Sequence, residues 1–322
     1  MVMFADCHSA ADKNNDLTEK IINRPEYASL NDSIRRFPDL ADLYLRRAAM
    51  LSKNNEHEIA LGDLKKAWEL HPDEETGFRY SATLSILGNS EGNIALLQQC
   101  VKLFPANTEY KRLLGEAYVQ AGGGNKALSL YDSLLTKDSA DFEAWYEKGL
   151  LLQQLKDTAG AILALEKALA LQPVSTYALE LAHLYAENKN PISLKLCDQV
   201  IKRDSTGELT DPFFIKGIYY ANTRQYEAAI VQFDSCIRKD WKFTDAYIEK
   251  GVIFFKQKKY EQAYNIFKLA ATVSNADPDA YYWMGRCFEV QNQKEQAKLN
   301  YERAYALDKK FTEAGQALER LK

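Results

Sequence analysis

A period of 34 residues recurs along this chain and constrains its fold more than any other feature. Five glycines lie 34 or twice 34 residues apart, five alanines follow them at a fixed offset, and a large apolar residue follows each alanine. These sets are Gly115, Gly149, Gly217, Gly251 and Gly285; Ala127, Ala161, Ala229, Ala263 and Ala297; and Tyr131, Leu165, Phe233, Phe267 and Tyr301. Such a period predicts stacked units that cannot bury their apolar faces alone.

Each unit has the pattern of two amphipathic helices. In 142–154, Trp145, Gly149 and Leu152 are spaced i, i+4 and i+7, so they share one helix face. Glycine costs up to about 1 kcal/mol against alanine inside a helix, so Gly149 indicates a place where two helices approach closely. Pro173 marks the end of the second helix of this unit. The pattern predicts an all-α fold.

These positions resemble the tetratricopeptide repeat family, whose pattern has Trp, Leu, Gly and Tyr on the first helix and Ala, Phe or Tyr, Ala and Pro on the second. In 278–311 only the proline place departs from the pattern, because Lys309 stands there. The resemblance implies a right-handed superhelical solenoid of antiparallel helix pairs. It is specific for the fold and poorly specific for the function, since the family serves many unrelated partners.

The repeat phase predicts the organisation of the whole chain. We expect a disordered segment at 1–16, an incomplete repeat at 17–40 and a capping helix at 312–322. Between them, about eight repeats are expected at 41–73, 74–107, 108–141, 142–174, 175–209, 210–243, 244–277 and 278–311. The repeat at 175–209 is irregular, because His183 and Lys195 stand where glycine and alanine belong. Repeat drift and a functional site both account for this irregularity.

The first residues allow two interpretations. Apolar and small residues precede Cys7, and a polar stretch follows it, which resembles the end of a bacterial lipoprotein signal within a longer precursor. Asp6 stands where such signals have a small residue. The alternative is a disordered N-terminus with an incidental cysteine. The chain is accordingly either a periplasm-facing bacterial lipoprotein, with Cys7 as the lipidated residue, or a cytoplasmic protein.

Composition and motifs argue against several function classes. The formal net charge of −4 comes with no basic block, so nucleic acid is not an expected ligand. No apolar run approaches the roughly 18 residues of a membrane span. The histidines and cysteines lack metal-ligand spacing, and Gly122–Gly124 fits a helix end better than a phosphate loop. We therefore expect no metal site, no cofactor and no enzymatic activity.

Acidic residues recur in the first turn of the predicted first helices, Asp245 and Asp279 among them. One interpretation is an acidic row that faces a basic ligand. The favoured one is that negative charge there complements the helix dipole, which contributes typically 0.3–1 kcal/mol per residue.

The concave surface is the predicted binding site. In the family, inner-surface residues come from positions five, nine and twelve of the first helix. The residues that this rule places on the groove are Tyr146, His183, Phe214, Ile218, Phe255, Tyr282 and Arg286. Apolar residues that gather in a groove indicate a partner site. The alternative is that tight winding of the solenoid buries them.

The predicted function is a non-enzymatic protein–protein interaction scaffold that holds a peptide segment or helix of a partner protein in its concave groove. Two alternatives remain. The chain is a lipid-anchored periplasmic component of a bacterial envelope assembly, or an accessory or sensor subunit of an enzyme on another chain.

Overall fold

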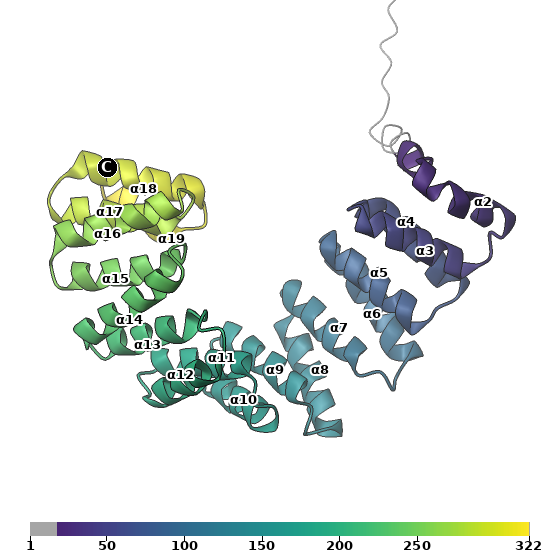
Figure 1. Ribbon diagram of the computed structural model, residues 1–322, viewed down its shortest axis with the longest axis horizontal. Coiled ribbons are helices and arrows are strands. Elements are labelled where there is room, and N and C mark those ends of the chain that lie inside the picture. The colour runs from purple at the N-terminus through teal and green to yellow at the C-terminus, as the bar shows by residue number, and fades with distance from the viewer. Residues whose placement is uncertain (1–17, 322) are drawn as a thin grey trace, which may run out of the picture. The chain divides into compact units, whose positions relative to one another are not determined.

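A computed structural model describes residues 18–321, and this part of the chain contains helices joined by short turns and no strand (Figure 1). The chain divides into two compact units, one ending at Leu151 and the other beginning at Leu152. No helix in the described part is long and apolar enough to cross a membrane. The all-α prediction is confirmed.

Unit 1 is built from consecutive helix pairs. Its elements are η1 (Pro25–Tyr27), α2 (Ala28–Arg36), α3 (Ala41–Lys53), α4 (His57–Leu70), α5 (Glu74–Ile86), α6 (Ser90–Leu103), α7 (Glu109–Gln120), α8 (Gly124–Lys137) and the larger part of α9 (Phe142–Gln154). The pairs are α3 with α4, α5 with α6, and α7 with α8.

Unit 2 continues the same pattern. It holds the end of α9, α10 (Thr158–Leu171), α11 (Ser175–Glu187), α12 (Ile192–Arg203), α13 (Asp211–Asn222), α14 (Tyr226–Lys239), α15 (Thr244–Lys256), α16 (Tyr260–Val273), α17 (Pro278–Val290), α18 (Lys294–Leu307) and α19 (Thr312–Arg320). The long connection between α12 and α13 is ordered by Asp204, whose carboxylate accepts hydrogen bonds from the backbone N–H groups of Thr206, Gly207 and Leu209.

A left-handed backbone conformation occurs in the turn inside each helix pair. The residues with positive φ in these turns are Asn55, Gly88, Gly122, Lys156, Lys189, Arg224, Lys258 and Asn292. A residue of this kind closes a helix and redirects the chain, and glycine adopts it without strain. Gly122, at φ 75°, thus ends α7, which explains the glycine run without a phosphate ligand.

The repeated glycines of unit 2 receive aromatic rings from the second helix of the same pair. A Cβ atom at Gly285 would lie 2.6 Å from the ring of Tyr301, and one at Gly217 or Gly251 would overlap the ring of Phe233 or Phe267. These rings are fully buried. The glycine and the ring therefore pack together, and the period in the sequence is the period of this contact.

Four cysteines of the described part are buried: Cys100, Cys197, Cys236 and Cys287. Burial raises the pKa of the thiol to about 11 at Cys100 and to about 12 at the other three. These thiols stay protonated at neutral pH and are poor nucleophiles. Cys7 lies outside the described residues.

Candidate partner-binding groove

A groove of about 530 Å³ lies in unit 2 and is lined by first helices of successive pairs. We call it the unit 2 groove. The helices α11, α13, α15 and α17 supply its lining residues: His183 and Glu187; Phe214, Ile218 and Asn222; Asp245, Ile248, Glu249, Val252 and Lys256; and Asp279 and Trp283. Ligand pockets typically have volumes of 300–1,000 Å³, so this space accommodates several side chains of a partner.

The spacing of the lining residues places those of each helix on one face of that helix. On α13, Phe214, Ile218 and Asn222 follow one another at intervals of four residues. On α15, Asp245 and Glu249 are likewise four residues apart. Side chains with this spacing lie one above the other on a helix face. Because successive first helices stack, these faces join into one surface.

The aromatic side chains of the groove are held in place by core contacts. The Phe214 ring packs against Phe233 and Phe243, with ring centroids 5.8 and 5.2 Å apart. The Trp283 ring stacks on Phe267 at 5.7 Å and meets the edge of Phe255 at 5.4 Å. Both rings are only partly buried, so each presents a fixed apolar surface to the groove.

The groove is acidic. It is lined by Glu187, Asp245, Glu249 and Asp279, against a single lysine, Lys256. Burial raises the pKa of Glu249, which Lys256 lowers in part and Asp245 and Asp279 raise further. The pKa of Asp279 is raised by burial and by the neighbouring carboxylates, Asp277 first among them. Burial and Asp277 also raise the pKa of Asp245.

Three of the predicted site residues line the groove: His183, Phe214 and Ile218. Tyr282 does not. It is only 9% exposed, and its ring packs against Trp283, Tyr301 and Phe311. Its placement on the groove wall is corrected, because this side of α17 faces the segment that leads into α19.

Phe255 and Arg286 lie beside the groove and not in its lining. The Arg286 guanidinium is 5.4 Å from the ring centre of Phe255 and 5.7 Å from that of Trp283. It also donates a hydrogen bond of 3.2 Å to the Tyr282 hydroxyl. Arg286, one of the residues predicted for the groove, is therefore already engaged with aromatic rings of its own unit.

Tyr146 belongs to unit 1, where it is half-buried on α9, whereas the other predicted residues belong to unit 2. Nearby on the same unit, Arg112 forms ion pairs with Glu109, Asp141 and Glu143.

The sequence did not single out Glu249 and Trp283 as groove residues. Asp245 and Asp279 were noted as first-turn acids, for which the helix dipole was the favoured interpretation and an acidic row facing a basic ligand the alternative. Glu249 and Trp283 occupy equivalent positions of successive repeats, one residue after the expected position five. On α15 the expected residue, Ile248, also lines the groove, whereas on α17 Trp283 lines it in place of the buried Tyr282.

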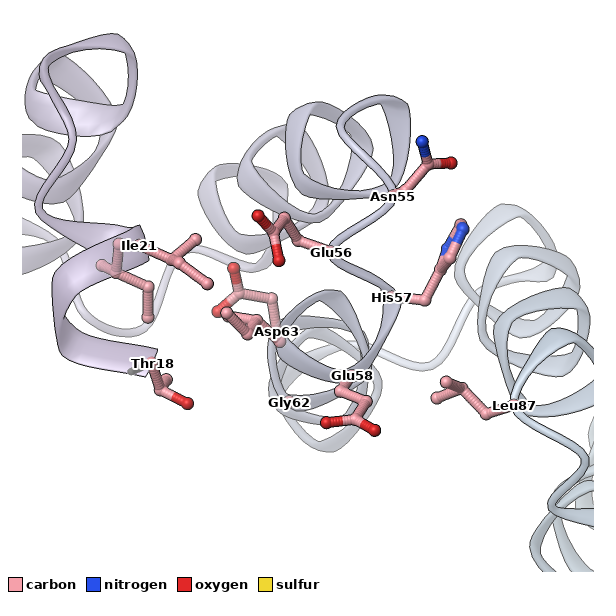
Figure 2. Close-up of a pocket in the computed structure, with 11 residues that line it drawn as sticks. Thr18, Ile21, Asn55, Glu56, His57, Glu58, Gly62, Asp63 and Leu87 are labelled. Atoms are coloured by element: carbon pink, nitrogen blue, oxygen red, sulfur yellow. The ribbon is translucent and has the colours of Figure 1, made fainter. Parts of the chain in front are cut away.

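A second hollow, of about 470 Å³, lies in unit 1 between the start of α4 and the residues around Thr18 and Ile21. Figure 2 shows Thr18 and Ile21 on one side of it and Leu87 on the other. Its deepest carboxylate, Asp63, accepts two hydrogen bonds from the Arg47 guanidinium, at 2.7 and 2.6 Å. The hollow therefore carries an acid that is already neutralised. We call it the unit 1 hollow.

Comparison with known proteins identifies the repeats. Models of the tetratricopeptide repeat match residues 112–176, 244–277 and 279–308. These three segments of the chain are tetratricopeptide repeats. A "TPR repeat-containing protein" of Treponema pallidum is 29% identical over 125 residues, which cover 32% of this chain and 16% of that protein. The chain thus aligns with only a small part of that relative.

Solved structures share the fold. A tetratricopeptide repeat protein from Parabacteroides merdae has a TM-score of 0.59 at 17% identity and covers 87% of this chain and 98% of its own. A chain of the APC/C hetero-tetramer Cut9–Hcn1 has a TM-score of 0.57 at 16% identity. The match covers 92% of this chain and 59% of that one. At these identities the likeness concerns the arrangement of tetratricopeptide helices alone.

Proposed function

We propose that this protein is a non-enzymatic interaction scaffold that holds a segment of a partner protein in the unit 2 groove. The observation that carries the proposal is the groove itself, a hollow on the first helices whose aromatic side chains are fixed from behind. Tetratricopeptide repeats are protein-interaction modules, and the structural likeness supports this general class.

The separation of groove from core supports the proposal. Glycine–ring contacts hold the pairs that begin with α13, α15 and α17 together, while His183 and Ile218 are partly exposed on the groove side. Ile218 also packs against core residues of its own and a neighbouring helix pair. Because neither side chain belongs to the fully buried core, replacing both should retain the fold.

Affinity capture from the native host tests the proposal. We expect the double variant His183→Ala with Ile218→Ser to lose at least about tenfold in capture of the main partner, with a melting temperature near that of wild type. The control is Val231→Ser on α14, which replaces an exposed apolar residue outside the groove. Equal capture by wild type and groove variant would place binding elsewhere.

A second proposal rests on the sequence alone and concerns lipidation of Cys7. The apolar, small, cysteine and polar succession at the start favours an anchor on a bacterial membrane. Several acyl chains on one residue give firm membrane attachment. Cys7→Ser should then release the native precursor from the membrane fraction, and an unmodified Cys7 in the mass of the native protein would contradict the idea.

A further inference from the structure

The charges that line the unit 2 groove do not balance. Four carboxylates, Glu187, Asp245, Glu249 and Asp279, face one ammonium group, Lys256, so the lining carries a formal charge of −4 + 1 = −3 with His183 neutral. A concave surface with one sign of charge raises the local concentration of ligands of the other sign.

Other basic residues on the first helices of unit 2 are engaged elsewhere. Lys216 pairs with Asp198 at 2.7 Å, and Lys250 pairs with Asp234 at 2.6 Å. Arg286 lies over aromatic rings and is 3.8 Å from Glu289. The groove carboxylates are therefore left with Lys256, and among the described residues Asp245 and Asp279 form no ion pair within 4.0 Å.

The partly buried Glu249 feels this imbalance most, because its raised pKa means that the folded chain disfavours its charged form. Asp245 and Asp279 are exposed, and neighbouring carboxylates contribute to their raised pKa values. A cation placed among the three carboxylates would favour their charged forms. No group of three or more His, Cys, Asp or Glu residues in the described part is arranged to hold a metal ion, so an organic cation fits the site better.

The apolar part of the groove suits the stem of such a cation. Phe214, Ile218 and Trp283 lie in the same lining as the carboxylates. Lysine and arginine bury their aliphatic stems against apolar surface while the charged end stays at a polar group. The groove therefore offers apolar surface to the stem and carboxylates to the charged end of one side chain.

We propose that the unit 2 groove binds a partner segment that carries lysine or arginine side chains, with charged ends at Asp245, Glu249 and Asp279 and stems on the apolar residues between them. This inference rests on the proposed function and specifies the chemistry of its partner.

The experiment uses fluorescein-labelled peptides of equal length that differ only in whether the variable positions hold lysine, glutamine or glutamate. Binding of each to the full chain is measured by fluorescence anisotropy. We expect wild type to bind the lysine peptide at least about tenfold more tightly than the glutamine peptide, and the glutamate peptide more weakly still. Added salt should weaken the lysine peptide most.

Two matched triple variants locate the effect. Asp245→Asn with Glu249→Gln and Asp279→Asn should reduce the lysine preference to within about twofold. The control triple replaces Glu227, Glu261 and Glu295 by glutamine; these are exposed first-turn acids of α14, α16 and α18. The control triple removes three negative charges, as the groove triple does, and should keep the preference for the lysine peptide. Melting curves of both variants show that the fold is retained.

The outcomes separate the inference from the proposed function. If wild type binds the glutamine peptide as tightly as the lysine peptide, the basic partner is wrong, while loss of that binding in Ile218→Ser would keep the groove as the site. If the control triple loses as much of the lysine preference as the groove triple, the peptide responds to the overall negative charge of the protein. The inference about the groove is then wrong. If no peptide binds, the inference also falls, and the capture experiment alone decides the function.

Discussion

The unit 1 hollow and the unit 2 groove are similar in size but differ in how their carboxylates are compensated. In the unit 1 hollow, two of the three lining carboxylates are paired, Asp63 with Arg47 and Glu56 with Arg24 at 3.2 Å, and the third, Glu58, is exposed to solvent. In the unit 2 groove, Asp245 and Asp279 have no such partner in the described part of the chain. Charges that are satisfied internally serve the fold, whereas charges left without a partner are available to a ligand.

Neutralising an acid should change the stability of the protein in opposite directions in the two regions. Asp63→Asn should destabilise the protein by about 3–5 kcal/mol, because the Arg47 side chain is only 11% exposed and would lose its partner. The change is measured by chemical denaturation. The double variant Arg47→Leu with Asp63→Leu should recover much of the loss, since no buried charge remains. A single variant as stable as wild type would show that the pair is dispensable.

A pair of glycines sharpens the comparison of packing. Gly251→Leu should cost about 1–3 kcal/mol, because any side chain there meets the buried ring of Phe267 behind the groove. The same change at Gly62, beside the unit 1 hollow, has open space around it and should be near neutral or slightly stabilising. The free energy of unfolding of the two variants, each compared with wild type, tests this difference. Equal losses would mean that the glycine–ring contact does not limit the fold.

Glu249→Gln should have the smallest effect and the opposite sign to Asp63→Asn. Because burial raises the pKa of Glu249 in the folded chain, the folded state binds the proton more readily than the unfolded state. Wild-type stability therefore falls as the pH rises from the ordinary carboxyl range through the raised folded value. The variant should melt higher at neutral pH, and its advantage should vanish in acid.

The control is Glu261→Gln on the exposed side of α16, which should change stability by no more than about 0.5 kcal/mol. If Glu249→Gln melts below wild type at neutral pH, its carboxylate makes a stabilising contact and the comparison of the two regions fails.

The fold follows from the sequence because it depends on one repeated local contact. In each well-formed repeat the glycine and the large apolar residue that packs on it are sixteen residues apart, as Gly251 and Phe267 are. The 34-residue period of this pair is therefore visible in the sequence. The groove is less predictable, because it depends on which side of each helix turns inward. Phe214 and Ile218 lie in the groove lining, whereas the equivalent side of α17 carries Tyr282 into the core.

The acidic character of the groove was also hidden in the sequence. Asp245 and Asp279 fit the helix dipole in any first turn, and only the structure shows that Lys216 and Lys250 are turned to other partners. Charge compensation is a property of neighbours distant in the chain, and one sequence does not reveal it.

The most direct test of the central claim, that the unit 2 groove is the binding surface, is a methyl NMR titration of isoleucine-labelled protein with the lysine peptide. The signals of Ile218 and Ile248, which line the groove, should shift together and saturate. The signals of Ile192, exposed on α12, and Ile59, in the unit 1 hollow, should stay in place. Shifts at Ile59 with Ile218 and Ile248 unchanged would contradict the account.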